Sequence, residues 1–179
     1  NIQKIGVNNP GVKIGENYTD FTQGSFRVTD NTYDLALSGD GFFAVEYTNS
    51  AGETDTKYTR AGAFTLDVDG YLVTKDGDYV LDTGNQHIQL NTLLDSKIDE
   101  QGNIYQNDRA VAKIQVTDFE DYDYLVKYGD TYYQPKEGAS LIESSATVNS
   151  GYLEMSNVQI VSEMVNMISV TRAYETNQK

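Results

Sequence analysis

The sequence lacks cysteine and tryptophan, and its 179 residues include one histidine and two prolines. Without cysteine, the chain has no disulfide framework, no thiolate nucleophile and no cysteine-ligated zinc site. With His87 as the single histidine, a histidine-rich metal site is also excluded. No nucleophile-elbow, phosphate-loop or dinucleotide-binding motif occurs. We therefore expect no catalytic residues, no metal ligands and no cofactor.

Positive charge is also scarce, because 13 Lys and Arg residues face 27 Asp and Glu residues, for a net charge of −14. Affinity for nucleic acid depends on Lys and Arg, so we expect no nucleic-acid partner. No apolar run approaches the roughly 18 residues of a membrane span, so we expect no membrane insertion. The sequence begins at Asn1 without an initiator Met and ends inside an expected helix. We therefore expect a piece of a longer protein, trimmed at both ends.

Tyrosine and glycine are abundant, with 14 and 15 residues. Tyrosine, valine and threonine favour strands, and glycine favours turns. From Tyr33 onward, short apolar-rich runs alternate with turns such as Asp76-Gly77, which supply the positive φ angles of tight hairpins. Strict alternation makes 110–119 the clearest expected strand. The pattern predicts a mainly β fold, with an extended lead-in over 1–25 and a hairpin-rich β-domain over 26–155. We also expect a helical turn at 121–128 and a loop at 138–145.

The period changes near the end of the chain. Residues 158–179 contain no glycine or proline, and their apolar residues form two series with spacings of three and four, as in coiled-coil seams. Ser156 and Asn157 are favourable N-cap residues. We therefore predict a C-terminal α-helix over 156–179, truncated at its end. Its wide apolar face leaves two alternatives, a helix buried in the core of its own domain or a helix that packs against several neighbours.

Two acidic segments suggest other functions. The segment 67–70 (DVDG) is similar to part of a calcium loop, but its glycine stands fourth instead of sixth, which favours a hairpin turn. Glu120 and Asp121 could supply the paired carboxylates of a glycoside hydrolase, although such a run is more often a solvated face. A calcium- or glycan-binding β-domain of a surface protein and a carboxylate-based hydrolase are therefore the alternatives from other functional classes.

Three motifs, in the same order along the chain, resemble the bacterial flagellar rod and hook proteins. The first is DFTQGSF at 20–26 followed by NTYDLALSGDGFFAV at 31–45, and the second is YTRAGAFTLDVDGYLV at 58–73. The third comprises GYLEMSNV at 151–158, EMVNMI at 163–168 and RAYETNQK at 172–179. Within the family, the residues of the third motif are most similar to those of the distal rod branch. The hook and the proximal rod are the alternatives.

The resemblance implies a structural, non-enzymatic subunit of the flagellar basal body. Such subunits polymerise into the tube that transmits torque from the motor to the hook and filament. The resemblance also implies that the terminal helices pair as a coiled coil lining the tube, with the β-domain outside. The implied partners are other copies of the chain, other rod and hook proteins, and the flagellar export apparatus.

The resemblance also implies roles for particular residues. Carried over position by position, the implied assembly surface is Val158, Ile160, Val161, Met164, Val165, Met167, Ile168, Thr171 and Tyr174. The implied junction between sheet and helix is Leu153, Glu154, Ser156 and Asn157. We expect Asn157 to cap the helix, with a contribution of about 1 kcal/mol.

Overall fold

The structure, a computed structural model, describes residues 19–157 and 160–177. The helical elements of these residues are a 3₁₀ turn, η1 (Tyr122–Tyr124), and an α-helix, α1 (Ile160–Asn177). The strands are β1 (Phe26–Val28), β2 (Leu35–Ser38), β3 (Phe42–Thr48), β4 (Thr54–Thr59), β5 (Phe64–Leu66), β6 (Leu72–Thr74), β7 (Tyr79–Val80), β8 (Ser96–Ile98), β9 (Asn103–Gln106), β10 (Arg109–Lys113), β11 (Val116–Phe119), β12 (Leu125–Tyr128), β13 (Tyr132–Pro135), β14 (Leu141–Glu143), β15 (Thr147–Ser150) and β16 (Tyr152–Glu154). The predicted fold class, mainly β with a C-terminal helix, is confirmed.

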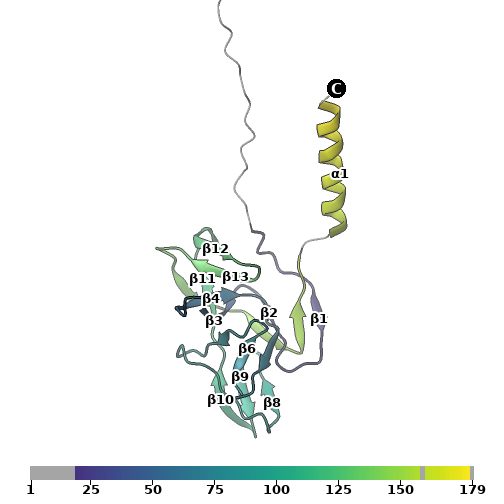
Figure 1. The fold of residues 1–179 in the computed structure, drawn as a ribbon. Helices are drawn as coiled ribbons and strands as arrows, with labels where there is room; N and C mark the ends of the chain where they lie inside the picture. The colour runs from purple at the N-terminus through teal and green to yellow at the C-terminus, as the bar shows by residue number, and fades with distance from the viewer. Residues whose placement is uncertain (1–18, 158–159, 178–179) are drawn as a thin grey trace, which may run out of the picture.

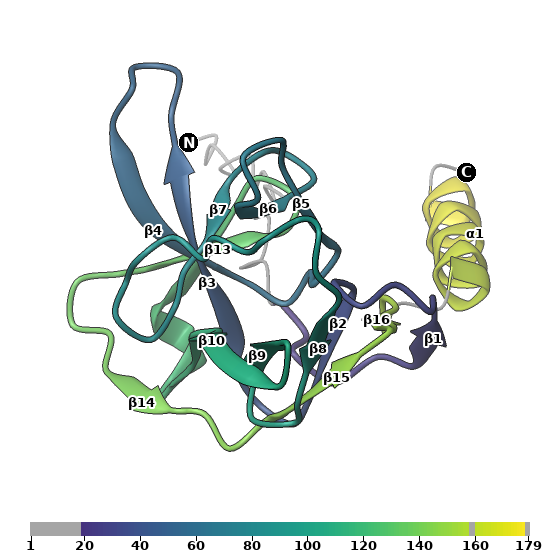
Figure 2. The ribbon, with the colours of Figure 1, turned by 90° about the horizontal axis from the view of Figure 1, so that it is seen from below.

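The strands form one large antiparallel sheet and three small ones (Figures 1 and 2). In the large sheet the order is β12-β13-β4-β3-β7-β6-β5, and β11 pairs with both β3 and β14. The strands β8, β9 and β10 form a separate three-stranded sheet. The other two sheets join distant parts of the sequence, because β2 pairs with β15 and β1 pairs with β16. The two ends of the described β-domain therefore lie side by side.

A single kind of five-residue turn recurs between the strands. In each copy, a side-chain oxygen of the first residue accepts hydrogen bonds from the backbone N–H groups of the third and fifth residues. The fourth residue has a positive φ angle, which glycine and asparagine tolerate best. The copies span 49–53, 67–71, 74–78, 82–86 and 99–103. The short polar side chains of Asp, Asn and Thr thus close the hairpins locally.

Two clusters of buried side chains form the core. The larger cluster includes Leu35, Phe43 and Leu72, and the ring of Phe43 meets that of Phe64 edge to face at a centroid distance of 5.1 Å. The smaller cluster centres on Phe42, whose side chain points to the opposite face of β3. Because β3 is buried on both faces, the GFF segment of the first motif is the centre of the β-domain.

Three local expectations were wrong. The expected strand over 110–119 is two strands in different sheets, because Ile114 leaves β10 to bridge Asp82 and the chain then enters β11. Only the start of 121–128 is helical, and its second half is the strand β12. The expected loop at 138–145 contains β14, which pairs with β11. The strands β11 and β14 pair with distant segments, β3 and β11, which local periodicity does not reveal. The strand β12 pairs with its neighbour β13 in a short hairpin, which was not expected from the sequence.

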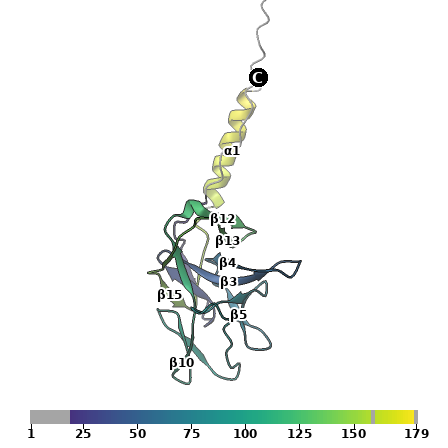
Figure 3. The ribbon, with the colours of Figure 1, turned by 90° about the vertical axis from the view of Figure 1, so that its left-hand side faces the viewer.

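The helix α1 stands clear of the sheets (Figures 1 and 3). Val170 and Tyr174 are 68% and 65% exposed, so this part of the helix is not buried in the core of its own domain. No helix of the described residues has the length and apolar character needed to span a membrane.

Candidate functional site: the junction between the β-domain and the helix

The helix presents apolar side chains to solvent. Met164, Met167 and Ile168 are 60%, 70% and 52% exposed. Thr171, also exposed, donates its hydroxyl hydrogen to the carbonyl oxygen of Met167, a bond of 2.9 Å within the helix. Contiguous exposed apolar side chains are typical of surfaces that associate with other molecules.

The structure describes only part of the implied assembly surface. Met164, Met167, Ile168, Thr171 and Tyr174 all lie on α1 with exposed side chains. Val158 lies outside the described residues. Ile160, Val161 and Val165 belong to α1, but their side chains also lie outside the described part. Membership of these nine residues in an assembly surface stays a prediction.

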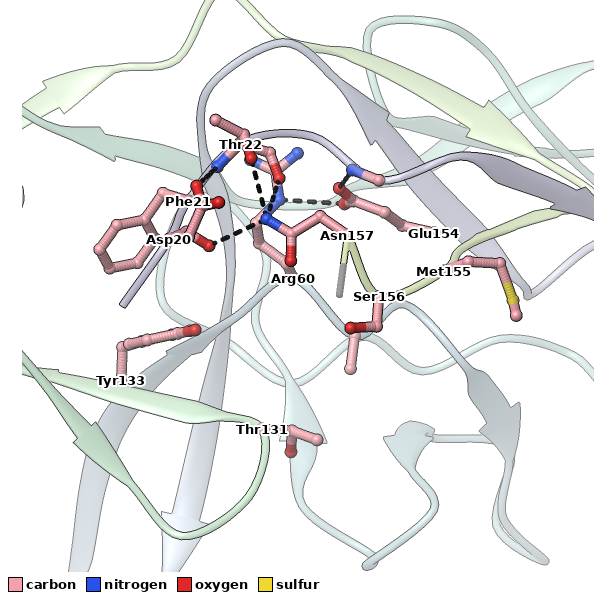
Figure 4. A pocket seen from close by; sticks show the side chains of 12 residues that line it. Asp20, Phe21, Thr22, Arg60, Thr131, Tyr133, Glu154, Met155, Ser156 and Asn157 are labelled. Atoms are coloured by element: carbon pink, nitrogen blue, oxygen red, sulfur yellow. Dashed lines mark hydrogen bonds and ion pairs between the residues drawn. The ribbon is translucent and has the colours of Figure 1, made fainter. Parts of the chain in front are cut away.

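The β1–β16 ribbon brings the lead-in segment alongside the start of the helical segment. Phe26 lies opposite Glu154, and the N–H group of Met155 donates to the carbonyl oxygen of Ser25 at 2.8 Å. The side-chain amide of Asn157 then donates to three oxygens of the lead-in. These are the carbonyl and hydroxyl oxygens of Thr22, at 3.0 and 2.9 Å, and the carbonyl oxygen of Asp20, at 3.3 Å (Figure 4).

The amide nitrogen of Asn157 therefore binds the lead-in. The predicted cap concerns its other side-chain atom, the oxygen, and the first turn of the helix. That turn adjoins residues 158–159, which lie outside the described residues, so the cap stays a prediction. The other implied junction residues, Leu153, Glu154 and Ser156, lie at the end of β16 or directly after it.

Glu154 connects the lead-in to the β-domain. One carboxylate oxygen accepts the N–H group of Gly24 at 2.9 Å, and the other accepts Nε of Arg60 at 3.0 Å. Gly24 itself has no room for a side chain, because an added Cβ would lie 1.7 Å from the carbonyl oxygen of Met155. The backbone of the lead-in at Gly24 therefore lies in direct contact with the backbone at Met155.

Aromatic side chains hold the lead-in from the other side. The ring of Phe21 lies 4.8 Å from that of Tyr122, 5.3 Å from that of Tyr133 and 6.0 Å from that of Phe42. Burial raises the pKa of Tyr133, with Arg60 acting to lower it and Glu154 to raise it. A hollow of about 220 Å³ remains between the lead-in, the junction and β13 (Figure 4).

Asp67 and Asp121, two of the carboxylates named for the alternative functions, accept hydrogen bonds within their own turns. Asp67 accepts the N–H groups of Asp69 and Tyr71, so its oxygen closes a hairpin turn. Asp121 accepts the N–H group of Asp123 at the start of η1. Across residues 19–157 and 160–177, no group of three His, Asp or Glu side chains is arranged to hold a metal ion. These observations do not favour a calcium site or a hydrolase.

No role was predicted from the sequence for Phe21, Gln23, Gly24 or Arg60, although all four lie within the quoted motifs. The structure shows that the three motifs meet at one place. The first supplies the lead-in, the second supplies Arg60, and the third supplies Glu154 and Asn157. The sign of this site in the sequence was the three motifs themselves. The place where they come together depends on strand pairing across the whole β-domain.

A folded β-domain that carries an uncovered apolar helix has the form of a subunit whose helix packs against other chains. Comparison with known proteins identifies the family. The model described as "Flagellar hook protein FlgE/F/G D1 domain" matches residues 36–106. The model described as "Flagellar basal body rod FlgEFG protein C-terminal" matches residues 149–179.

Individual relatives extend these matches over the chain. The flagellar basal-body rod protein FlgF of Caulobacter vibrioides is 37% identical over 161 residues, which cover 89% of this chain and 64% of that protein. FlgF of Mesorhizobium japonicum is 34% identical over 90% of this chain and 66% of that protein. The rod protein FlgG of Bacillus subtilis is 31% identical over 100% of this chain and 70% of that protein. The chain belongs to the flagellar hook and basal-body rod protein family.

The chain spans slightly less than two thirds of the length of the two FlgF relatives. Relatives with both names, FlgF and FlgG, match it at similar identity. These matches therefore do not separate the branches of the family, and the distal rod-like assignment stays a prediction.

Proposed function

We propose that the chain is a structural, non-enzymatic subunit of the bacterial flagellar rod, located in the basal body and closest to the distal rod. It polymerises with other copies of itself and contacts other rod and hook proteins. The flagellar export apparatus delivers it to the growing rod. Family membership and the rod-protein names of its relatives support this function.

The uncovered apolar face of α1 is the observation that carries the proposal. An isolated helix of 18 residues is marginally stable in water, so it gains most of its stability when another element covers its apolar side chains. The lead-in leaves the β-domain beside the same junction, held there by Asn157 and Glu154. A helix before the lead-in, which the family resemblance implies, could therefore pair with α1, and neighbouring subunits could cover the remaining face.

Contacts between different surfaces of successive copies produce open helical polymers, as a tubular rod requires. The net charge of the described part of α1 is also small, since Glu163 and Glu175 oppose Arg172. The acidic charge of the chain lies mainly in the β-domain. A helix with little net charge and an apolar surface is suited to close packing against other copies.

The proposal can be tested by placing charge on the exposed face of the helix. We expect the double substitution Met164→Asp and Ile168→Asp in the full-length protein to abolish rods in isolated basal bodies, as seen by electron microscopy, together with motility. In the present chain the same change should leave the urea midpoint of the β-domain unaltered.

Ser169→Asp is the control for each single substitution, because, like Met164→Asp or Ile168→Asp alone, it adds one negative charge, but at a polar position of the helix. We expect this variant to assemble rods. Normal rods in the Met164→Asp, Ile168→Asp strain would contradict the proposed role of the helix.

A further inference from the structure

The geometry points to Arg60 as the positioning residue of the β1–β16 ribbon. It fixes the direction in which the lead-in enters the β-domain and in which the chain leaves it after β16. Its guanidinium group donates to the carbonyl oxygens of Gly41 at 3.2 Å, Gly39 at 3.1 Å and Leu37 at 3.4 Å. These carbonyl groups belong to the corner between β2 and β3. Its remaining contact is the ion pair with Glu154, at the end of β16.

The ion pair differs from the others in the described part of the chain. The side chains of Arg60 and Glu154 are 16% and 12% exposed, and the two residues are 94 positions apart. Lys57 pairs with a mostly exposed Asp55 only two positions away. In the pair of His87 and Glu46, both side chains are about one third exposed. Among the described ion pairs, only that of Arg60 connects the β-domain to the ribbon through two mostly buried partners.

The β1–β16 ribbon has few other backbone hydrogen bonds to the β-domain, although β16 also lies beside β2. Within the described residues, its two strands pair only with each other. At the beginning of β16, the N–H groups of Gly151 and Tyr152 donate to the carbonyl oxygen of Asp34, at 2.8 and 3.3 Å. At the end of β16, Glu154 reaches Arg60. β16 is thus hydrogen-bonded to the β-domain at both of its ends. Without the contact at Glu154, this end is held, among the described contacts, only by the lead-in and by packing against β2.

The same corner also receives the lead-in. The side-chain amide of Gln23 donates to the carbonyl oxygen of Leu37 at 2.6 Å, and its oxygen accepts the N–H group of Gly39 at 3.4 Å. The corner therefore binds Arg60 and Gln23 at once, and through Glu154 it is linked to Gly24. A planar guanidinium with several fixed donors can hold such an arrangement, while a lysine ammonium offers no comparable geometry.

A buried ion pair generally adds less to stability than an apolar pair of similar volume, although losing only one partner is costly. Neither Arg60 nor Glu154 belongs to the two buried clusters of the core. Their removal as a pair should therefore leave the β-domain folded. The function that we assign to this ion pair is to fix the direction of the β1–β16 ribbon relative to the β-domain.

The test uses two spin labels on this cysteine-free chain, so that each introduced cysteine is labelled alone. Val68→Cys places one label on the β-domain, where the side chain is 97% exposed. Phe26→Cys places the other on the ribbon, where the side chain is 40% exposed and the residue lies opposite Glu154, at the end of the ribbon away from Asp34. Pulsed electron paramagnetic resonance then gives the distribution of distances between them. A label pair at Val68 and Val111, both on the β-domain, is the internal control.

We expect a narrow distribution for the parent chain and one at least twice as wide for the double variant Arg60→Met, Glu154→Leu. This variant leaves no unpaired buried charge, but the carbonyl groups of the corner and the N–H group of Gly24 lose their partners. We therefore expect a lower urea midpoint with a single cooperative transition, which shows that the β-domain still folds. Arg60→Lys should give an intermediate width. An unchanged width in the double variant overturns the proposal, and so does equal broadening of the control pair, because the ion pair would then support the whole domain.

The consequence for assembly rests on the proposed function and is tested separately in full-length protein. We expect the double variant to form fewer than a tenth as many rods as the parent. If it broadens the distances but assembles normally, positioning by Arg60 is unnecessary for assembly, although the helix variants still test the rod function. If the helix variants also assemble normally, the proposed function fails, and the distance result stands independently.

Discussion

The two parts of the molecule treat apolar side chains in opposite ways. In the β-domain, Phe43 and Leu72 are completely buried, whereas on α1 Met167 and Ile168 are more than half exposed. Burial of apolar surface is the main favourable contribution to folding. The β-domain is therefore stabilised by its own buried core. The stability of the helix depends on a further element that covers its apolar side chains. The same kind of side chain stabilises the fold in one region and is available for association in the other.

The largest expected effect tests this difference directly. Phe43→Ala removes a buried ring that packs against Phe64, and we expect the free energy of unfolding to fall by about 3–5 kcal/mol. Met167→Ala is the counterpart on the helix and should change it by less than about 0.5 kcal/mol, since the side chain is already in solvent. Urea unfolding followed by circular dichroism measures both. Equal losses for the two variants would show that the helix packs on the β-domain in solution.

A pair of glycine substitutions distinguishes the interior of the β-domain from its hairpin tips. Gly62→Ala would place a Cβ 1.8 Å from the carbonyl oxygen of Leu35, so the backbone must shift, at a cost of about 2–3 kcal/mol. Gly52→Ala meets no atom within 4 Å, but its φ angle of 81° is unfavourable for alanine by about 1 kcal/mol. Thermal unfolding should rank the two in this order, and the reverse order would contradict the close contact at Gly62.

The closed turns of the β-domain predict a pH dependence. Burial acts to raise the pKa of Asp99, but hydrogen bonds from the side chain and N–H group of Asn103, from Tyr105 and from the N–H group of Gln101 outweigh it. The pKa of Asp99 is therefore lower in the folded state. This contribution to stability is present above the unfolded pKa, near pH 4, and is lost as the pH falls through the folded value.

We expect Asp99→Asn to lower the free energy of unfolding by about 1 kcal/mol at neutral pH. The difference from the parent should disappear as the pH falls well below 4, because the parent then carries a protonated carboxyl. Urea unfolding across this pH range measures it. Glu100→Gln, at the exposed neighbouring position, is the control. A difference that persists unchanged in acid would contradict the ionised form of Asp99 as the stabilising one.

The smallest effects are expected where the two regions meet. Asn157→Asp keeps a side-chain oxygen for the predicted helix cap but loses the amide that donates to Thr22. Asn157→Ala loses both. We expect helicity to stay constant in the first variant and to fall in the second, with a loss of up to about 1 kcal/mol. Circular dichroism measures helicity, and the amide resonances of Thr22 report release of the lead-in in both variants. Unchanged helicity and melting in Asn157→Ala would refute the cap.

Much of the fold followed from local chemistry. Turns at 67–71 and 74–78 were expected from their Asp-Gly pairs, because such turns are formed by residues adjacent in the sequence. The break between β10 and β11 could not be read this way. Alternation continues through Ile114, while the partners of the two strands, β9 and β3, lie in different sheets. Sheet membership depends on distant residues, which a single periodic pattern does not contain.

The candidate site shows the same limit. Spacing within the helix, together with the resemblance, predicted which of its side chains form an assembly surface. Met164 and Ile168 are exposed, but so is Val170, which is not in the predicted set, so the prediction stays untested. No periodic pattern in the sequence singles out Arg60. Its importance comes from three carbonyl groups at the β2–β3 corner and from Glu154, and these groups meet only after the sheet has formed. The resemblance contained all of these residues within its motifs but not their mutual contacts.

The self-closing turns have a consequence for the order of events in folding. A hairpin such as β3–β4, closed by the turn at 49–53, joins neighbours in the sequence and can form in roughly 1–10 μs. The pairs β2–β15 and β1–β16 join opposite ends of the chain, at a larger entropic cost of closure. We therefore expect the hairpins to form early and the ribbon to close late. When β1 pairs with β16, we expect the rest of the β-domain to have formed already. The β1–β16 pairing therefore distinguishes a fully folded subunit from a partly folded one.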